Sequence, residues 1–253
     1  MPFIQSSHAR GITTLVLDSP ANRNALSIGL MRELLEALSA AAGDEATRAV
    51  VLDHTGKVFC SGADLGETAA AASSGDMPAN MLGDTLAAIA ENPKPVIAVV
   101  RGPARAGGVG LIAAADLAVC SRSATFAFSE VRLGVIPALI SATVLPRLQA
   151  RAAAELFLTG EAFDGERAAQ IGLVSAAVPE EEIDATVALW CGSLVRGAPR
   201  ALAATKALLR RNPTLADINE LSALSLEFFS SAEGREGVAA FRAKRPAAWV
   251  PAT

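Results

Sequence analysis

Short apolar runs alternate with longer amphipathic stretches through the first half of the chain. The short runs are rich in β-branched residues or alternate with polar ones, which is typical of strands; they cover residues 11–19, 48–56, 96–100, 117–121 and 125–130. Between them, apolar residues recur at helical spacing over residues 27–44, 80–92 and 107–116. This order of strand, helix and strand predicts right-handed crossovers between parallel strands.

From about residue 140 the pattern becomes almost wholly helical. Helices are predicted over residues 151–160, 164–172, 181–197 and 199–212, followed by a last pair that ends near Lys244. We therefore predict an α/β core over residues 1–197 and a helical C-terminal region over residues 198–253. Segment 66–79 is small, polar and rich in glycine and is predicted to be a mobile loop.

Composition excludes several classes of protein. The net charge of -4 provides no basic field for bulk nucleic-acid binding. No apolar run reaches the ~20 residues that a membrane span requires. Cys60, Cys120 and Cys191 are widely spaced with no histidine nearby, so we expect free thiols rather than a zinc or other metal site. Free thiols indicate a reducing compartment, and we expect a cytoplasmic protein that binds neither nucleic acid nor membrane.

A glycine cluster follows the apolar strand 96–100. Gly108–Ala113 fits the dinucleotide pattern G-x-G-x-x-A, with Glu130 near the expected acidic position. That pattern requires glycines directly after the strand, whereas "RGPARA" intervenes here, and the next strand ends without an acid. A glycine run before a helix also exposes backbone N–H groups beside the positive end of the helix dipole, which suits a carbonyl oxygen that acquires negative charge. Close packing of helix on strand is the alternative use of such glycines.

A second loop has the same character. "FCSGADLG", residues 59–66, follows the strand 48–56 just as the glycine cluster follows the strand 96–100. Two such loops at the ends of neighbouring strands could each donate one N–H to a single oxygen.

Five blocks, in order and spread over nearly the whole chain, resemble the enoyl-CoA hydratase/isomerase, or crotonase, superfamily. They are "DSPANRNAL" (18–26), "SGADL" (61–65), "IAVVRGPARAGGVGLIAAADL" (97–117), "FAFSEVRLGVIP" (126–137) and "EGREGVAAFRAKRPAAW" (233–249). The resemblance implies a crotonase-like α/β spiral of ββα turns with a helical C-terminal trimerisation region. It also implies a homotrimer or dimer of trimers in fatty acid metabolism.

The resemblance further implies that the substrate is a coenzyme A thioester, with no separate cofactor. By position, the amides of Ala63 and Gly107 would form an oxyanion hole for the thioester oxygen, and Glu130 would be the catalytic acid/base at C2. The positions implied to bind coenzyme A are Arg23, Ala25, Ser61, Ala63, Asp64, Leu65, Gly107, Gly108, Phe241 and Lys244.

Several of these positions have a second interpretation. Asp64 could instead cap the following turn, and Lys244 could be a solvated helix end rather than a contact from a neighbouring subunit. Arg105 could steer an acyl carboxylate or cap its own loop. His8 and His54 are predicted to be surface or strand-edge residues.

One position departs from the family pattern. Familiar hydratases carry a first glutamate three residues after the oxyanion-hole glycine, and here that position is Gly110. Hydration would then depend on Glu130 alone or on an acid of the 66–79 segment such as Glu67. We expect an enoyl-CoA hydratase, because residues 105–116 and 129–137 resemble hydratases. The alternatives are a Δ3,Δ2-enoyl-CoA isomerase, which needs one base and no water, and a non-catalytic acyl-CoA-binding or scaffold protein.

Overall fold

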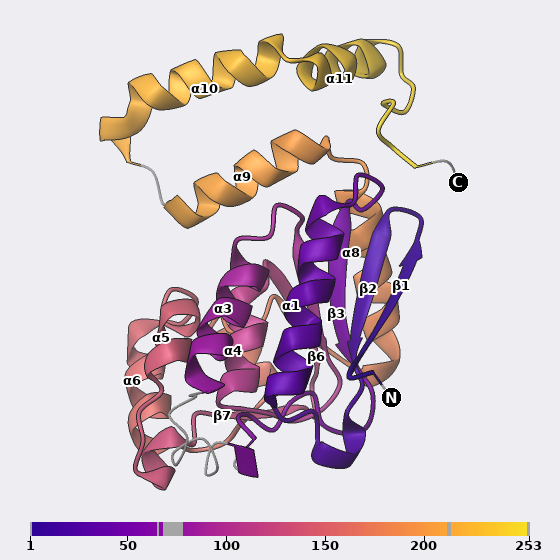
Figure 1. Cartoon of the computed structure of the whole chain (residues 1–253). Coiled ribbons are helices and arrows are strands. Elements are labelled where there is room, and N and C mark those ends of the chain that lie inside the picture. The colour runs from indigo at the N-terminus through magenta and orange to yellow at the C-terminus, as the bar shows by residue number, and fades with distance from the viewer. Residues whose placement is uncertain (1, 65, 68–77, 212–213, 252–253) are drawn as a thin grey trace.

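The main sheet has six strands in the order β1-β2-β3-β4-β6-β9, in a computed structural model that describes residues 2–64, 66–67, 78–211 and 214–251 (Figure 1). The strands are β1 (Ile4–Ala9), β2 (Ile12–Leu17), β3 (Ala49–His54), β4 (Val96–Val100), β6 (Leu117–Ser121) and β9 (Ala176–Val178). From β2 to β9 all neighbouring pairs are parallel, which confirms the prediction for β2, β3, β4 and β6. β1 pairs antiparallel with β2 through a tight hairpin.

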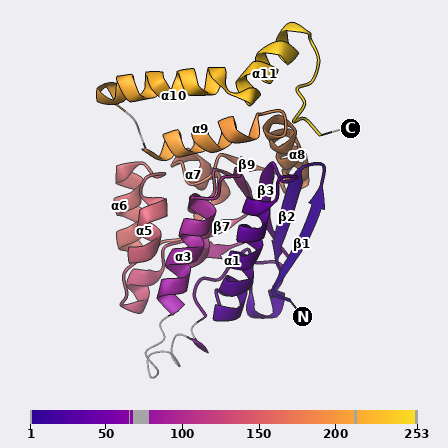
Figure 2. The ribbon, with the colours of Figure 1, turned by 45° about the horizontal axis from the view of Figure 1, so that its top comes forward.

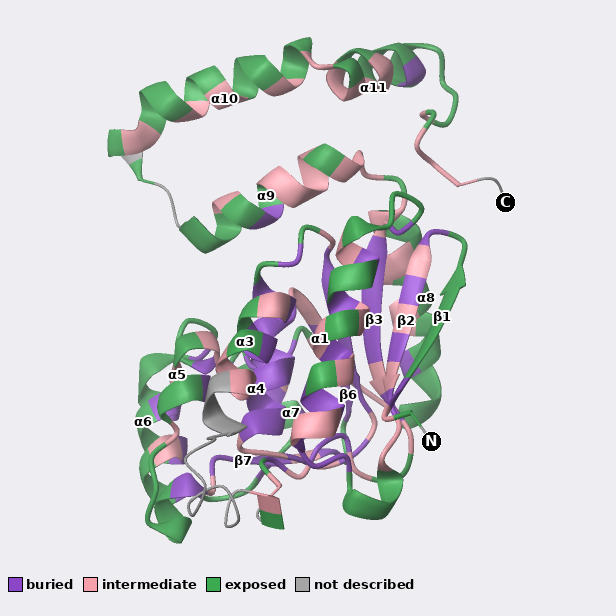
Figure 3. Ribbon diagram, viewed as in Figure 1, coloured by how far each residue is buried: buried purple, intermediate pink, exposed green. Residues whose placement is uncertain are grey.

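Helices cover both faces of this sheet. In β4, Val96, Ala98 and Val100 face one layer, while Ile97 and Val99 face the other, because side chains alternate along a strand. The first layer contains α1 (Ile28–Gly43), α3 (Pro78–Ala90) and α4 (Gly107–Ala114). The second is α8 (Ile183–Leu194), which follows η3 (Glu180–Glu182) and whose Ile183 joins the smaller core cluster. Figure 3 shows the resulting burial of the central strands and of α4.

A smaller three-stranded sheet lies beside the main one. It consists of β5 (Ala104–Arg105), β7 (Thr125–Ala127) and β8 (Phe163–Asp164), with β5 parallel to β7 and β8 antiparallel to it. The chain leaves β7 into η2 (Glu130–Leu133) and then α5 (Ala138–Val144), α6 (Ala150–Thr159) and, after β8, α7 (Gly165–Gln170). α5 packs on α4 and α3. Glu130 of η2 and Gly107, the first residue of α4, line the same cavity.

The last helices lie over one end of the core. They are α9 (Pro199–Arg211), η4 (Leu215–Asp217), α10 (Ile218–Ser230) and α11 (Ala232–Arg242). Figures 1 and 2 show α10 and α11 stacked beyond α9, away from α5. α9 is attached to the core by Lys206, whose Nζ lies 2.7 Å from Asp116 Oδ2. The proposed division at residues 197 and 198 stays a prediction; it falls between α8 and α9.

The sequence pattern missed four short or polar strands. β1 exposes five of its six residues, so it carries no apolar alternation. β5 and β8 have only two residues each, and β9 adds a strand to a region predicted to be almost wholly helical. In the predicted loop 66–79, Gly66 and Glu67 are helical and Pro78 begins α3, while residues 68–77 lie outside the described part of the chain.

Candidate active site

Short parallel pairings bring three loops of the chain to one place. Leu26 pairs with Ala63, Cys60 with Ala104, and β5 with β7, all in parallel. Because the carboxyl ends of parallel strands open on the same side, the residues that follow these pairings converge there. Ala106 and Gly107 follow β5, and Glu130 follows β7.

A cavity of about 400 Å³ occupies this point of convergence. Its lining side chains come from α1, the Ala63 and Gly107 loops, α3, η2 and α5, and are mostly apolar. The lining consists of Leu26, Met31, Ala63, Leu82, Ala106, Gly107, Glu130, Val135, Ile136, Pro137, Ala138, Leu139 and Ile140. Among the described lining residues, Glu130 carries the one titratable side chain.

Two backbone amides at the cavity donate no hydrogen bond to any described part of the chain. The Leu26 N–H donates to Gly62 O (2.8 Å) and the Asp64 N–H donates to Leu26 O (3.5 Å), so the intervening Ala63 N–H is turned to the other side of the chain. Gly107 is the first residue of α4, where amides have no partner within the helix. Within the described residues neither amide donates a hydrogen bond. Such donors at a helix N-terminus suit an oxygen that gains negative charge.

The glycines of this loop also serve close packing. A Cβ at Gly107 would lie 2.7 Å from Leu26 Cδ1, and one at Gly108 would lie 2.7 Å from Cys60 Cβ. Gly107 lines the cavity, whereas Gly108 packs against the Cys60 loop and does not. The sequence left two uses of these glycines open, close packing and exposure of an amide. The structure shows both, at neighbouring glycines.

Glu130 is a buried carboxyl group without a partner for one oxygen. Its residue is only 8% exposed, and Oε2 is buried with no hydrogen-bond partner among the described residues. Burial raises the pKa of Glu130, because the charged form loses water without gaining a cation. A carboxyl group of raised pKa in an apolar cavity is a candidate acid/base.

Gly110, one helical turn after Gly107, has no space for a side chain. A Cβ there would lie 2.6 Å from Ile140 Cγ2 and 3.2 Å from Leu86 Cδ2. Ile140 therefore occupies the volume into which residue 110 would project. A side chain that carries a second carboxylate here would require Ile140 to move.

The acids of the Ala63 loop are engaged in helix capping. Glu67 Oε2 accepts a hydrogen bond from the Ile28 N–H (2.6 Å) at the start of α1. Asp64 accepts from the amides of Gly66 (2.9 Å) and Glu67 (3.1 Å) and from Asn22 Nδ2 (2.8 Å). These bonds, above all the Glu67 amide, lower the pKa of Asp64. Asp64 thus caps the turn that follows it, and Glu67 is not among the described lining residues of the cavity.

The predicted coenzyme-binding positions fall into two groups. The Ser61 N–H donates to Arg23 O (3.1 Å), so Arg23 and the buried Ala25 lie beside the Ser61–Asp64 loop. Leu65 lies outside the described residues. Phe241 is 86% exposed on α11 and Lys244 follows it, at the end of the molecule opposite α5 (Figure 1). Within one chain the structure does not bring these last two residues to the cavity.

Three other polar candidates have structural partners. The Arg105 guanidinium donates to Thr125 O (2.6 Å), Thr125 Oγ1 (2.9 Å) and Ala104 O (2.9 Å), so it caps its own loop. His54, predicted to be a surface or strand-edge residue, is instead buried at the end of the inner strand β3. Its Nε2 accepts from the Arg101 N–H (3.1 Å), and burial lowers its pKa. His8 lies at the strand edge, as predicted, with Nδ1 3.1 Å from Thr13 Oγ1.

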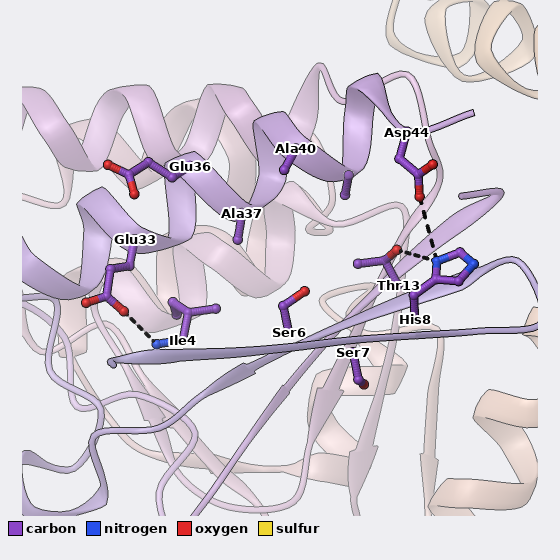
Figure 4. A pocket seen from close by; sticks show the side chains of 11 residues that line it. Ile4, Ser6, Ser7, His8, Thr13, Glu33, Glu36, Ala37, Ala40 and Asp44 are labelled. Atoms are coloured by element: carbon purple, nitrogen blue, oxygen red, sulfur yellow. Dashed lines mark hydrogen bonds and ion pairs between the residues drawn. The ribbon is translucent and has the colours of Figure 1, made fainter. Parts of the chain in front are cut away.

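A second cavity of about 620 Å³ lies between β1 and α1 (Figure 4). Several of its polar side chains already have partners: Glu33 Oε2 accepts from the Ile4 N–H (3.0 Å), and His8 Nδ1 lies 3.8 Å from Asp44 Oδ2. It contains neither a free buried acid nor a helix N-terminus. The cavity at Glu130 is therefore the stronger candidate for chemistry.

Sequence reasoning missed the apolar wall of the site. Met31, Leu82, Leu139 and Ile140 come from three different helices. In the sequence, only the family-like block 126–137 lies next to any of these residues. Side chains that line a cavity follow no sequence motif of their own.

Comparison with known proteins agrees with this site. A Rhodobacter capsulatus protein named a probable enoyl-CoA hydratase is 36% identical over 246 residues, covering 94% of each chain. The mouse "Enoyl-CoA hydratase domain-containing protein 3, mitochondrial" is 33% identical over 253 residues, covering 94% of this chain and 81% of the relative. A crystal structure of an enoyl-CoA hydratase from Mycobacterium avium is 41% identical, with a TM-score of 0.75 and 98% of each chain covered.

The fold is that of the crotonase enzymes. Among the described residues, its apolar cavity combines one buried acid with two amides that donate no hydrogen bond. The chain belongs to the enoyl-CoA hydratase/isomerase family, whose family model matches residues 7–251. Members of this family act on acyl-CoA thioesters. Within the described residues, every helix is too short or too polar to span a bilayer.

Proposed function

We propose that the chain is a Δ3,Δ2-enoyl-CoA isomerase acting on thioesters with an apolar acyl group. The observation that carries the proposal is the composition of the cavity: among its described lining residues, Glu130 is the single acid/base. Moving a double bond from C3 to C2 requires one base that removes a proton and returns it elsewhere, whereas adding water requires a group that holds the water.

In the proposed reaction, the Ala63 and Gly107 amides donate hydrogen bonds to the thioester oxygen. The Glu130 carboxylate removes one proton from C2 of the 3-enoyl thioester, and the electron pair moves onto that oxygen as a dienolate. Glu130, now a carboxylic acid, returns the proton to C4 while the C2–C3 double bond forms. No water is consumed, and the amides stabilise the charge that develops on the oxygen.

Hydration of a 2-enoyl-CoA is the second candidate, and the names of the relatives favour it. In that reaction water would add its hydroxyl to C3 and a proton would reach C2 through Glu130. Gly110 and Ile140 provide no polar group to hold the water, which is why we rank hydration second.

Paired assays test the proposal. With a 3-enoyl-CoA, we expect the absorbance of the conjugated thioester to rise; with crotonyl-CoA, a hydratase would instead make it fall. Glu130→Gln should lower isomerisation by ~10² to 10⁴-fold, while the exposed acid of the other cavity, changed by Glu36→Gln, should leave the rate unchanged. Loss of crotonyl-CoA absorbance without isomerisation would favour hydration. Turnover of neither substrate across chain lengths would contradict both reactions and favour a non-catalytic acyl-CoA-binding protein.

The remaining expectations complete the proposal. Coenzyme A enters as part of the substrate, and no separate cofactor is required. The assembly is a homotrimer or dimer of trimers, in which Phe241 and Lys244 approach coenzyme A from a neighbouring subunit. The compartment is the cytoplasm; the buried free thiols of Cys60 and Cys120 fit a reducing environment.

A further inference from the structure

Ile140 has an unusual position in the wall of the cavity. It lines the cavity yet is only 2% exposed, because its side chain is seated directly on Gly110 of α4. The Thr143 hydroxyl lies 3.2 Å from both Gly110 O and Ile140 O, and so holds α5 on α4 at this point. Ile140 and Gly110 therefore form a matched pair, in which the absence of one side chain makes room for the other.

The wall around this pair is apolar. Leu86 also contacts the Gly110 position, and Leu82 and Leu139 line the cavity nearby. An ordered water requires two to four polar partners, and a bare apolar wall provides none. A charged acyl group would also lose its hydration here without gaining a cation, since no lysine, arginine or histidine is among the described lining residues.

We propose that Ile140, seated on Gly110, is a specificity-determining residue that keeps this wall apolar and dry. It restricts the site to uncharged hydrocarbon acyl groups and favours return of the proton over addition of water. The inference rests on the proposed function, because it concerns the outcome of the same proton transfer at Glu130.

Two ratios measured on one enzyme sample test the inference, and neither depends on the fraction of protein that folds. The first is the ratio of 3-hydroxyacyl to 2-enoyl product formed initially from a 3-enoyl-CoA, separated by chromatography. The second is the ratio of kcat/KM for a straight-chain substrate to that for the same chain bearing a terminal carboxylate.

Ile140→Ser removes apolar volume and adds a hydroxyl, so the first ratio should rise, and the second should fall, by about tenfold or more. Ile140→Val should keep both ratios near the wild-type values. Val144→Ala is the matched control, because Val144 is a buried apolar residue of the same helix outside the cavity lining. It should lower stability and leave both ratios unchanged.

A double-mutant cycle tests the pairing itself. Gly110→Ala alone forces Ile140 to move and should lower kcat/KM about tenfold or more. In Gly110→Ala/Ile140→Ala the new methyl group enters vacated space, so the two changes should be strongly non-additive.

The outcomes separate the two proposals. Wild-type isomerisation combined with unchanged ratios in Ile140→Ser, or with additive effects in the cycle, would overturn the role of Ile140 and leave the proposed function standing. No isomerisation by the wild type would overturn the function itself, and this inference with it.

Discussion

At the scale of single residues, burial changes the acid–base behaviour of Glu130. Because its pKa is raised above the ordinary value of 4.5, the basic carboxylate is lost at a higher pH than for an exposed glutamate. We expect kcat/KM to fall on the acid side with an apparent pKa above 4.5. A pH–rate profile of the wild type over pH 4–9 measures this limb. An apparent pKa at or below that of an exposed glutamate would contradict this expectation.

The same burial links Glu130 to stability. A carboxyl group with a raised folded-state pKa stabilises the fold below its unfolded pKa, and this contribution is lost as the pH rises through the folded pKa. Glu130→Gln removes the buried charge, so it should raise the free energy of unfolding at pH 8 relative to the wild type, with the gain disappearing toward pH 4. Urea denaturation at both pH values gives the comparison. An equal effect at the two pH values would show that the buried charge is not the cause.

Ala106, which precedes the Gly107 amide, stores backbone strain. Its φ of 47° is unfavourable for a residue with a Cβ. Ala106→Gly should raise the free energy of unfolding by about 1 kcal/mol, and the β-branched Ala106→Val should lower it. Denaturant titration of both variants measures the difference. Destabilisation by glycine would mean that packing of the Ala106 methyl group outweighs the strain.

At the scale of elements, α9 is held to the core by a buried ion pair. Lys206 is 7% exposed, and its Nζ also lies near Ile89 O (3.3 Å) and Lys94 O (3.2 Å). Asp116 Oδ2, its partner, accepts in addition from the Val96 N–H (2.8 Å). The pair therefore joins α9, the start of β4 and the loop after α4.

Removing Lys206 should be costly, because among the described residues the partly buried Asp116 would keep only the Val96 N–H and a longer contact of 3.9 Å to Arg210. We expect Lys206→Ala to lower the free energy of unfolding by about 3 kcal/mol. The double variant Lys206→Met/Asp116→Asn keeps the volume of both side chains and removes both charges. It should lower the free energy of unfolding less than Lys206→Ala does. Chemical denaturation of the wild type and of these two variants is the measurement. A loss below 1 kcal/mol for Lys206→Ala would mean that other contacts anchor α9.

At the scale of the whole molecule, the C-terminal helices expose large apolar side chains. Leu209, Leu226, Phe229 and Phe241 are all well exposed in the single chain. These side chains are the surface that we propose for contact between subunits. It lies on the region for which a trimerisation role is proposed.

Association should therefore depend on α10. We expect the wild type to sediment at a mass three or six times that of the 25.9 kDa chain. Phe229→Asp should shift it toward the monomer, because a charge at a buried interface loses its hydration. Leu189→Asp, at an exposed leucine on α8, is the control and should sediment like the wild type. A monomeric wild type in sedimentation equilibrium would contradict the proposed assembly.

By itself, the sequence determined the long elements and the positions of the candidate catalytic groups. β2, β3, β4 and β6 and most of the helices follow from hydrophobic periodicity, because each encodes which of its faces is buried. The positions of Ala63, Gly107 and Glu130 came from resemblance to the family's residue blocks, each of which is one short continuous stretch of the chain. The edge strand β1 escaped because its residues are polar, and β5 and β8 escaped because two residues carry no periodicity.

Only the tertiary structure decided which of these groups share a cavity and what surrounds them. Ala63, Gly107 and Glu130 meet through pairings of one or two residues, which long-range packing creates and local sequence does not encode. The same packing places Ile140 on Gly110, ties Glu67 to α1 and keeps Phe241 far from the cavity. Contacts between residues distant in the chain depend on how whole layers pack, and no short stretch of sequence contains that information.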